Sequence, residues 1–268
     1  MASPNRPKKR PRSYDAEKLR TAVLAQFAAV RAAVEGLTPE QLAAPTRLGD
    51  WTVRDLAAHV TMAVGMLPRG LAQPAPPRAD LPLLDYPALV APAAPAVAVA
   101  VHELADSAPL SELYAEVAAG LDTYLPAGVD GERPVAHRVG VMTLTGVLVT
   151  RAVELVAHTD DLNDAVPGLD LPVERQLLAA ATRFLADALA AKAPGASTEV
   201  RIPPFAVVQC VEGPRHTRGT PPNVVETDPM TWIRLATGRT GWTSALDDAL
   251  VSASGERADL EALLPIMA

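Results

Sequence analysis

The sequence predicts an α+β protein in which a helical bundle over residues 14–168 precedes a smaller mixed domain over residues 169–268. In the first half, apolar residues recur every three or four positions, which is the spacing of amphipathic helices. In the second half, short runs such as TEVRI and FAVVQCVE have the composition of strands and are separated by prolines. Aromatic residues make up only 4% of the chain, so Ala, Val and Leu must form the core, as in closely packed helices.

Caps and apolar spacing define the first helices. An apolar series from Leu19 to Val34 predicts a first helix, and the stretch TPEQL predicts a short second one. The stretch GDWTVRDLAAHV begins a third helix, in which Thr52 caps the N-terminus and Asp55 stands at the reciprocal position. His59 therefore lies two turns into that helix.

Residues 68–95 contain eight prolines and few periodic apolar positions, which predicts a long irregular connection with the length of a lid or a site wall. Helical spacing returns over residues 110–125 and over residues 141–162. The last of these helices is apolar on nearly all sides, so we expect it at the centre of the bundle. The apolar window 88–101 is shorter than the roughly 20 residues of a membrane span and contains prolines, so we expect no span there.

The second domain is predicted to be one sheet with helices on a single side. A helix over residues 173–192 precedes the strands, which are TEVRI, FAVVQCVE, VVET and VSASG. A further helix begins at Asp228, with Pro229 in its first turn, and the stretch ADLEALLPIM predicts a final helix.

Charge and cysteine content exclude several classes of function. The net charge of −7 argues against a nucleic-acid surface over the whole chain. The one basic run lies in residues 1–13, which we expect to be a disordered, solvated tail. No apolar signal-peptide core follows it, so we expect a cytoplasmic protein. Cys210 is the only cysteine, so any metal must be held by nitrogen and oxygen atoms.

The stretch RAVELVAHTDDL carries the candidate site. Glu154 and His158 are four residues apart, which on a helix brings their Cβ atoms to about 5–6 Å and allows both side chains to bind one ion. His59 is the best candidate for a third ligand, because its apolar helix is expected to lie beside this one. Two histidines and one carboxylate leave a coordination position open, as in catalytic ions. Zinc is the first choice, with non-haem iron or nickel as alternatives.

The same residues have a purely structural interpretation. Glu154 can pair with Arg151 on the preceding turn, and His158 can be a core histidine that is hydrogen-bonded to a backbone carbonyl. Spacing alone does not decide between the two.

Several other polar residues have open roles. Asp55 could orient the ring of His59, although its place at the helix start already explains it. Asp160 and Asp161 lie near a helix end, where acidic groups oppose the dipole, which allows a role near the site. The remaining histidines have no evident partners, and we expect them to be solvated: His102, His137 and His216.

Together these residues carry a resemblance to a known family. WTVRDLAAHV and RAVELVAHTDDL resemble the paired signature of the mycothiol-dependent maleylpyruvate isomerase family, within the DinB-like four-helix-bundle superfamily. The tail DPMTWIRLATGR with VSASGERADLEALLP is similar to the sterol-carrier-like C-terminal domain that accompanies this bundle. The resemblance covers most of the chain. It implies that the metal ligands are His59, Glu154 and His158.

The resemblance also implies a chemistry. In such an isomerase or thiol transferase, zinc or another divalent metal binds the thiol of mycothiol and favours its thiolate. The thiolate adds to a small electrophilic substrate, and rotation and elimination then isomerise a cis enoyl diacid. Arg239, in the sequence ATGR, is expected to bind a substrate carboxylate, with Arg234 as the alternative. A helix-end cation that offsets the dipole is the structural interpretation of Arg239.

A second class of function follows from the C-terminal domain. Sterol-carrier-like domains hold apolar ligands under their sheet, so the protein could be a carrier of lipids or other apolar ligands in which the bundle is only structural. A bound ion with an open coordination position would favour the enzyme, and a long apolar tunnel without metal would favour the carrier. The oligomeric state is not predicted.

Overall fold

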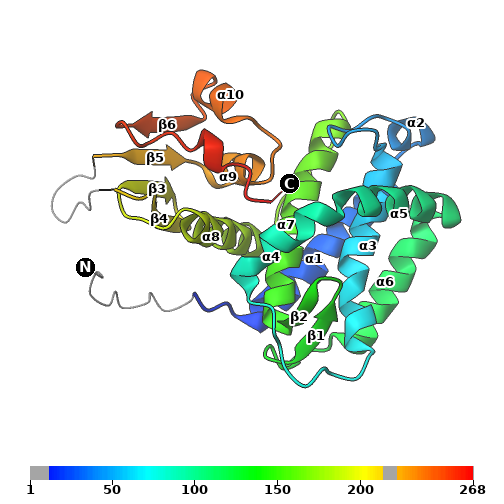
Figure 1. Ribbon diagram of the computed structural model, residues 1–268. Helices are drawn as coiled ribbons and strands as arrows, with labels where there is room; N and C mark the ends of the chain where they lie inside the picture. The colour runs from blue at the N-terminus through cyan, green and yellow to red at the C-terminus, as the bar shows by residue number, and fades with distance from the viewer. Residues whose placement is uncertain (1–11, 214–221, 268) are drawn as a thin grey trace.

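Four long helices form the N-terminal bundle (Figure 1). The structure, a computed structural model, describes residues 12–213 and 222–267. The bundle helices are α1 (Ala16–Glu35), α3 (Val53–Leu71), α6 (Leu110–Tyr124) and α7 (Leu144–Ala165), and the short α2 (Pro39–Leu42) precedes α3. All were predicted from caps and apolar spacing. The capping boxes at Thr38 and Thr52 are both present.

Helix α7 is the centre of the bundle, as its apolar composition predicted. It packs against α1, α3 and the following helix α8 (Arg175–Lys192), and nearly all of its residues from Gly146 to Leu162 are buried. The helix begins three residues later than the apolar spacing suggested, because Thr143 caps it by accepting a hydrogen bond from the Gly146 N–H.

A two-stranded hairpin precedes α7 and was not predicted. Strands β1 (Pro134–His137) and β2 (Gly140–Thr143) are antiparallel, with Val135 opposite Met142. Val141, which the sequence analysis placed on the fourth helix, lies in β2. The hairpin has one buried side, which rests on α3 and α7, so only its tertiary packing distinguishes it from the start of a helix.

The proline-rich connection is irregular over only part of the predicted range. Helix α3 runs on to Leu71 with Pro68 inside it. Helical turns then resume at Leu83 and continue, as η1 (Leu83–Asp85), α4 (Tyr86–Val90), η2 (Ala91–Ala93) and α5 (Ala94–Ser107). The prediction of an irregular chain to residue 95 is therefore wrong. Three of its prolines lie in the first turns of α4, η2 and α5, where a missing N–H breaks no hydrogen bond.

This helical stretch is apolar and mostly exposed. Among the described residues, Leu83–Ser107 is the one helical segment long and apolar enough to cross a membrane, by its 25 residues and a mean hydropathy of 1.6. Only 11% of its most apolar window is buried. Part of its inner side forms a wall of the cavity described below.

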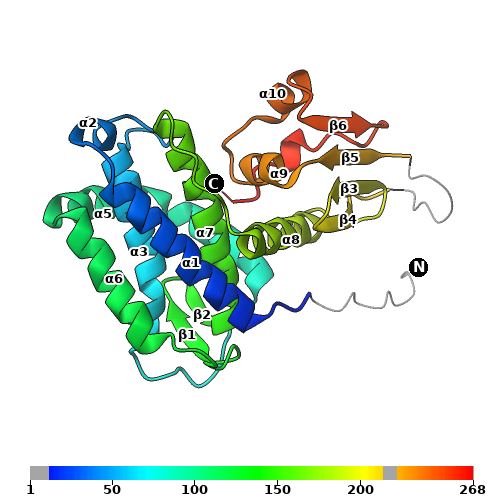
Figure 2. The same ribbon diagram turned by 180° about the vertical axis from the view of Figure 1, so that it is seen from behind.

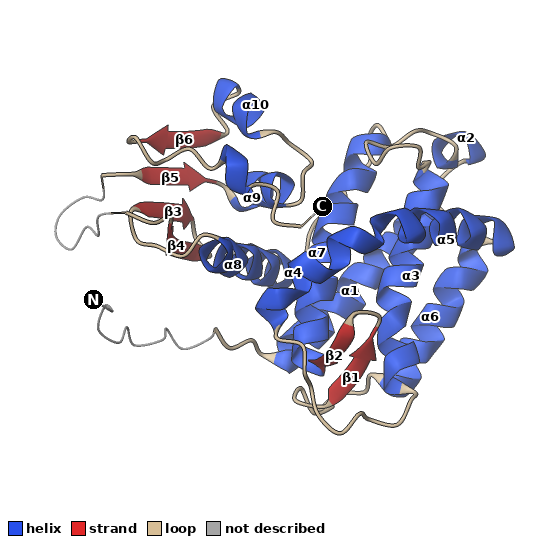
Figure 3. Ribbon diagram, in the orientation of Figure 1, coloured by secondary structure: helices blue, strands red, loops and turns tan. Residues whose placement is uncertain are grey.

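The C-terminal part contains a four-stranded sheet in the order β4-β3-β5-β6 (Figure 3). Strands β3 and β5 are parallel and the other neighbours are antiparallel. The strands are β3 (Thr198–Ile202), β4 (Ala206–Cys210), β5 (Val224–Thr227) and β6 (Val251–Ser254), and the helices after β5 are α9 (Pro229–Ala236) and α10 (Trp242–Asp247). The four predicted strands and the Asp228 cap of α9 are confirmed, whereas α10 was not predicted.

One face of this sheet is buried and the other is open. Buried and exposed residues alternate along β4, where Val207 on the open face is 55% exposed. Helix α8 packs against β4 and α9 and also against α7 of the bundle, so it joins the two parts of the molecule (Figure 2). The combination of a helical bundle with a smaller sheet domain confirms the predicted α+β class.

The two chain ends depart from prediction. The final helix is only a 3₁₀ turn, η3 (Glu261–Leu263), after which the backbone N–H of Met267 donates to the Ala236 carbonyl. The basic tail lies mostly outside the described residues, but Arg12 at its end pairs with Asp187 of α8 at 2.8 Å. That part of the tail is thus held against the fold.

Replacement of Thr52 by alanine tests the cap that positions α3. Its hydroxyl accepts from the Asp55 N–H and donates to the Asp55 carboxylate at 2.6 Å. We expect Thr52→Ala to lower the free energy of unfolding by about 1 kcal/mol in urea denaturation. Thr123→Ala, at an exposed position in the last turn of α6, should change it by less than about 0.5 kcal/mol. Equal stabilities of Thr52→Ala and the unsubstituted protein would contradict the capping role.

Candidate metal centre

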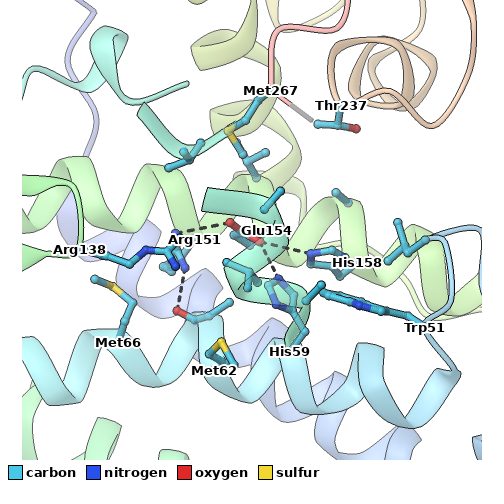
Figure 4. Close-up of a pocket in the computed structure, with 18 of the residues that line it drawn as sticks. Trp51, His59, Met62, Met66, Arg138, Arg151, Glu154, His158, Thr237 and Met267 are labelled. Carbon is cyan, nitrogen blue, oxygen red and sulfur yellow. Dashed lines mark hydrogen bonds and ion pairs between the residues drawn. The ribbon is translucent and has the colours of Figure 1, made fainter. Parts of the chain in front are cut away.

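The packing of α3 against α7 brings the three predicted ligands together (Figure 4). His59 Nε2 and His158 Nε2 each lie 3.3 Å from the same oxygen, Oε2 of Glu154. The two imidazole rings are nearly perpendicular, with centroids 4.7 Å apart. One ligand atom from each residue lies within 4.8 Å of the others. The predicted convergence of a histidine from one helix with an acid and a histidine from another is therefore present.

The spacing of these atoms fits a small divalent ion. Zinc bonds of about 2.0–2.1 Å in a tetrahedral site place neighbouring ligand atoms about 3.3–3.4 Å apart. Both nitrogen-to-oxygen distances, at 3.3 Å, have this length. The distances from both histidines to the shared oxygen thus fit a zinc-like ion held by these residues.

The hydrogen bonds of His158 give a second reason to place a cation here. Its Nδ1 lies 2.9 Å from the carboxylate of Asp161, which also accepts a hydrogen bond from Arg239 and is ionised. An ionised carboxylate only accepts, so the Nδ1 of His158 must be the donor. In the neutral ring Nε2 then has a lone pair, which faces the lone pairs of Glu154. A cation or a proton between these atoms resolves the repulsion.

His158 is therefore oriented by an acid and not by a backbone carbonyl. The carboxylate–histidine arrangement fixes the tautomer and the ring direction that a metal ligand needs. Burial disfavours protonation of His158, but hydrogen bonds with Asp161 and Glu154 outweigh it and raise the pKa of the imidazole. Burial would raise the pKa of Asp161, but the hydrogen bonds and positive charges of His158 and Arg239 outweigh it and hold that pKa below its ordinary range.

Glu154 has a different partner on each oxygen. Its Oε1 lies 3.6 Å from Nη2 of Arg151, whereas Oε2 faces the two histidines. Burial would raise the pKa of Glu154, but the charge of Arg151 and the hydrogen bonds of both histidines hold it well below the ordinary value. The pairing with Arg151 that the sequence suggested as an alternative is thus present together with the predicted site.

His59 lacks the supporting partner that the sequence suggested. Asp55 does not orient its ring: the carboxylate of Asp55 instead accepts from Thr52 and bonds to Nδ1 of His102 at 3.1 Å. The buried Nδ1 of His59 has no hydrogen-bond partner among the described residues. Trp51 lies against the ring, with centroids 5.0 Å apart. Burial lowers the pKa of His59, which keeps the ring neutral and able to bind a metal.

Two other histidines also differ from prediction. His102 was expected to be solvated without a partner, but its side chain is only 40% exposed and contacts Asp55 and Asp50. His137 was expected on the surface, but it packs edge-on against Tyr86 and lines the cavity. Burial and the positive charges of nearby arginines lower the pKa of His137 to about 4, so it is neutral at pH 7. His216 lies outside the described residues.

The acids at the end of α7 join the two parts of the molecule. Arg234 of α9 forms a bidentate pair with Asp160, at 2.6 and 2.8 Å. Arg239, after α9, donates to Asp161 at 2.9 Å, and Arg47 from the bundle donates to both acids. Of the roles near the site that were left open for these acids, Asp161 has one as the partner of His158, and both acids also pair the C-terminal part with the bundle beside the ligands.

Arg239, the predicted substrate-binding residue, lies in the lining of the cavity and is 13% exposed. Its Nη1 donates to the carbonyl of Thr237 at 2.8 Å, while the Asp161 carboxylate accepts from the other side of the guanidinium. Arg239 and His158 thus share one buried acid. Arg234, the alternative, is occupied by Asp160 and does not line the cavity.

A cavity of about 550 Å³ opens beside the three ligands. Residues of α3, the α4–α5 segment, the hairpin turn, α7 and the C-terminal part all contribute to it (Figure 4). Sequence reasoning missed Tyr86 and Arg138 of this lining. Tyr86 lies in the stretch taken for a loop, and Arg138 lies in the hairpin that was not predicted, so no pattern in the sequence indicated either residue. The volume is typical of sites for organic ligands.

Comparisons with known proteins agree with this architecture. The family model described as Mycothiol maleylpyruvate isomerase N-terminal domain matches residues 23–163, and the one described as Bacterial SCP ortholog matches residues 174–266. The crystal structure of the mycothiol-dependent maleylpyruvate isomerase has 16% identity and a TM-score of 0.59, over 92% of this chain and 95% of that chain. A histidine-to-alanine variant of that isomerase gives 17% identity and a TM-score of 0.58, with the same coverage. The search of functionally curated proteins found no match.

At these identities the solved structures establish the fold of the chain. Family membership rests on the sequence itself, because the N-terminal family model matches more than half of the 268 residues and includes all three candidate ligands. The chain belongs to the mycothiol maleylpyruvate isomerase N-terminal domain family.

Proposed function

We propose that the protein is a metal-dependent thiol enzyme of the maleylpyruvate isomerase type. It would activate mycothiol or a similar thiol for addition to a small electrophilic substrate. The observation that carries this proposal is the set of three ligand atoms from His59, Glu154 and His158, which lie at zinc-like spacing beside a cavity of about 550 Å³. Membership in the family supports the use of a thiol cofactor and isomerisation as the type of reaction.

The ligand set suits catalysis better than structural metal binding. Two nitrogens and one oxygen leave a fourth position, and the three residues line the cavity, so that position is accessible to a ligand. A divalent ion held there supplies a Lewis-acidic position that lowers the pKa of a coordinated thiol.

The protein's own residues prepare the site for such an ion. Glu154 remains ionised because Arg151 and the histidines outweigh its burial. Asp161 holds His158 in the tautomer whose Nε2 is free to bind. Burial keeps His59 neutral at the same time. Glu154 and His59 are thus held in their metal-binding protonation states at neutral pH, whereas His158, whose pKa is raised, would release its Nε2 proton when an ion binds.

Arg239 is proposed to bind a carboxylate of the substrate. It lines the cavity, and its contacts with Asp161 and the Thr237 carbonyl fix the direction of the guanidinium. A substrate carboxylate would share this arginine with Asp161. The same acid would then hold one metal ligand and one substrate-binding group.

The packing of the C-terminal part favours the enzyme over the lipid carrier. The covered face of its sheet is filled by fully buried side chains, namely Val200, Ile202, Val208 and Trp232. The cavity of about 550 Å³ lies at the three ligands and not under the sheet.

Metal analysis of single-histidine variants tests the ligand set. Protein purified without chelator should contain about one divalent ion per chain. Loss of one ligand should leave His59→Ala and His158→Ala nearly metal-free while circular dichroism shows the fold retained. His102→Ala is the matched control, because the ion pairs of His102 within the described residues are with Asp50 and Asp55 and not with a ligand, so the metal content should be unchanged. Equal metal content in all four proteins would refute the assignment.

A thiol-dependent isomerisation assay tests the chemistry. With a cis enoyl diacid as substrate, we expect turnover that requires both mycothiol and the metal. His158→Ala should reduce kcat/KM by more than about 100-fold, because the metal stabilises the transition state by several kcal/mol. Turnover without added thiol, or equal turnover by His158→Ala, would argue against the proposal.

A further inference from the structure

The cavity beside the three ligands has two kinds of wall. One wall is apolar and consists of Met62 and Met66 of α3 together with residues of the α4–α5 segment, namely Val90, Ala94, Val97 and Ala98. Another part of the lining carries guanidinium groups, among them Arg138 at the hairpin turn. A small diacid has polar groups at both ends and would leave the apolar wall without a partner.

The arginines of the cavity differ in the partners that they already have. Arg151 donates to the Ala63 carbonyl and to the Tyr86 hydroxyl, and it faces Glu154. Arg239 is held by Asp161, and Arg69 donates to the Met62 carbonyl. Arg138 forms no hydrogen bond or ion pair with any residue in the described ranges 12–213 and 222–267. Its donors are therefore free for a ligand.

The surroundings of Arg138 favour an anion. Its side chain extends from the hairpin turn towards Arg151, near Met66 (Figure 4). His137, the neighbouring cavity residue, is neutral at pH 7 because burial and the charges of Arg151 and Arg138 disfavour its protonation. Two guanidinium groups thus approach one side of the cavity, where only Arg151 has an acidic partner. The guanidinium of Arg138 has no acidic partner among the described residues, and a ligand carboxylate matches its pattern of hydrogen-bond donors.

We propose that this cavity binds an electrophile with one carboxylate and an apolar chain or ring, in which the α3 and α4–α5 wall holds the apolar part. Arg138, whose donors are free, would then hold the single carboxylate in place of Arg239, which Asp161 and the Thr237 carbonyl already engage. That the ligand is an electrophile rests on the proposed function. The preference for one carboxylate and an apolar part rests on the residues that line the cavity. Each methylene buried against the wall should strengthen binding about fourfold.

Calorimetric titration with unreactive probes tests this preference without a thiol or turnover. Octanoate should bind at least tenfold more tightly than butyrate and than maleate, because only octanoate reaches both walls. Octanamide, which has the same chain without the charge, should bind more weakly than octanoate. If maleate or butyrate binds as tightly as octanoate, the apolar part of the proposal is overturned.

Two pairs of variants assign the contacts. Arg138→Met should weaken octanoate about tenfold or more and leave octanamide unchanged, whereas Arg78→Met, at an exposed arginine outside the cavity, should alter neither. Val97→Asn should weaken octanoate but not butyrate, whereas Val99→Asn, at a residue that is 60% exposed outside the lining, should have no effect.

The remaining outcomes also decide the question. If octanoate binding is kept in Arg138→Met but lost in His59→Ala, the carboxylate lies on the metal. If neither Arg138→Met nor Val97→Asn affects the binding, octanoate binds elsewhere. Either result overturns the proposal. If the isomerase assay shows no turnover, but octanoate still binds and Arg138→Met weakens its binding, only the proposed function is refuted.

Discussion

The buried charge of Glu154, where α3 packs against α7, is the constraint on which the site depends. A carboxylate in such a position costs several kcal/mol unless charges and hydrogen bonds compensate it. Arg151 compensates one oxygen, and the histidines of two helices meet at the other. Nδ1 of His158 donates its proton to Asp161, so in the neutral ring the Nε2 lone pair faces the lone pairs of this second oxygen. A cation between these atoms removes the repulsion. The buried carboxylate of Glu154 thus accounts both for the arrangement of the ligands and for the charges that surround them in the core.

The same acid network determines how the C-terminal part meets the bundle. Asp160 and Asp161 lie near the end of the central helix, and within the bundle Arg47 pairs with both acids while His158 pairs with Asp161. Arg234 and Arg239 complete the pairing from the other part of the chain. Because both acids are buried, separating the two parts would remove partners from buried charges. The orientation of His158 and the placement of Arg239 over the cavity are therefore coupled through Asp161.

The sequence predicted those structural features that depend on residues close together in the chain. The caps of α2, α3 and α9 and the strands of the sheet follow from nearby residues, and the pair Glu154 and His158 follows from helical spacing. The third ligand depended on which helices pack together, and only the family resemblance decided it. The hairpin before α7, the helical course of the chain from Leu83 and the pairing of Asp55 with His102 depend on tertiary contacts. For that reason Arg138 and Tyr86 could not be found by spacing.

Anomalous diffraction tests the central claim most directly. Crystals of protein purified without chelator would be measured above the absorption edge of whichever metal a fluorescence scan detects. The account predicts one strong peak, at about 2.0–2.2 Å from His59 Nε2, Glu154 Oε2 and His158 Nε2 and open towards the cavity. A map without a peak at this position, in which the three side chains keep their direct contacts, would contradict it.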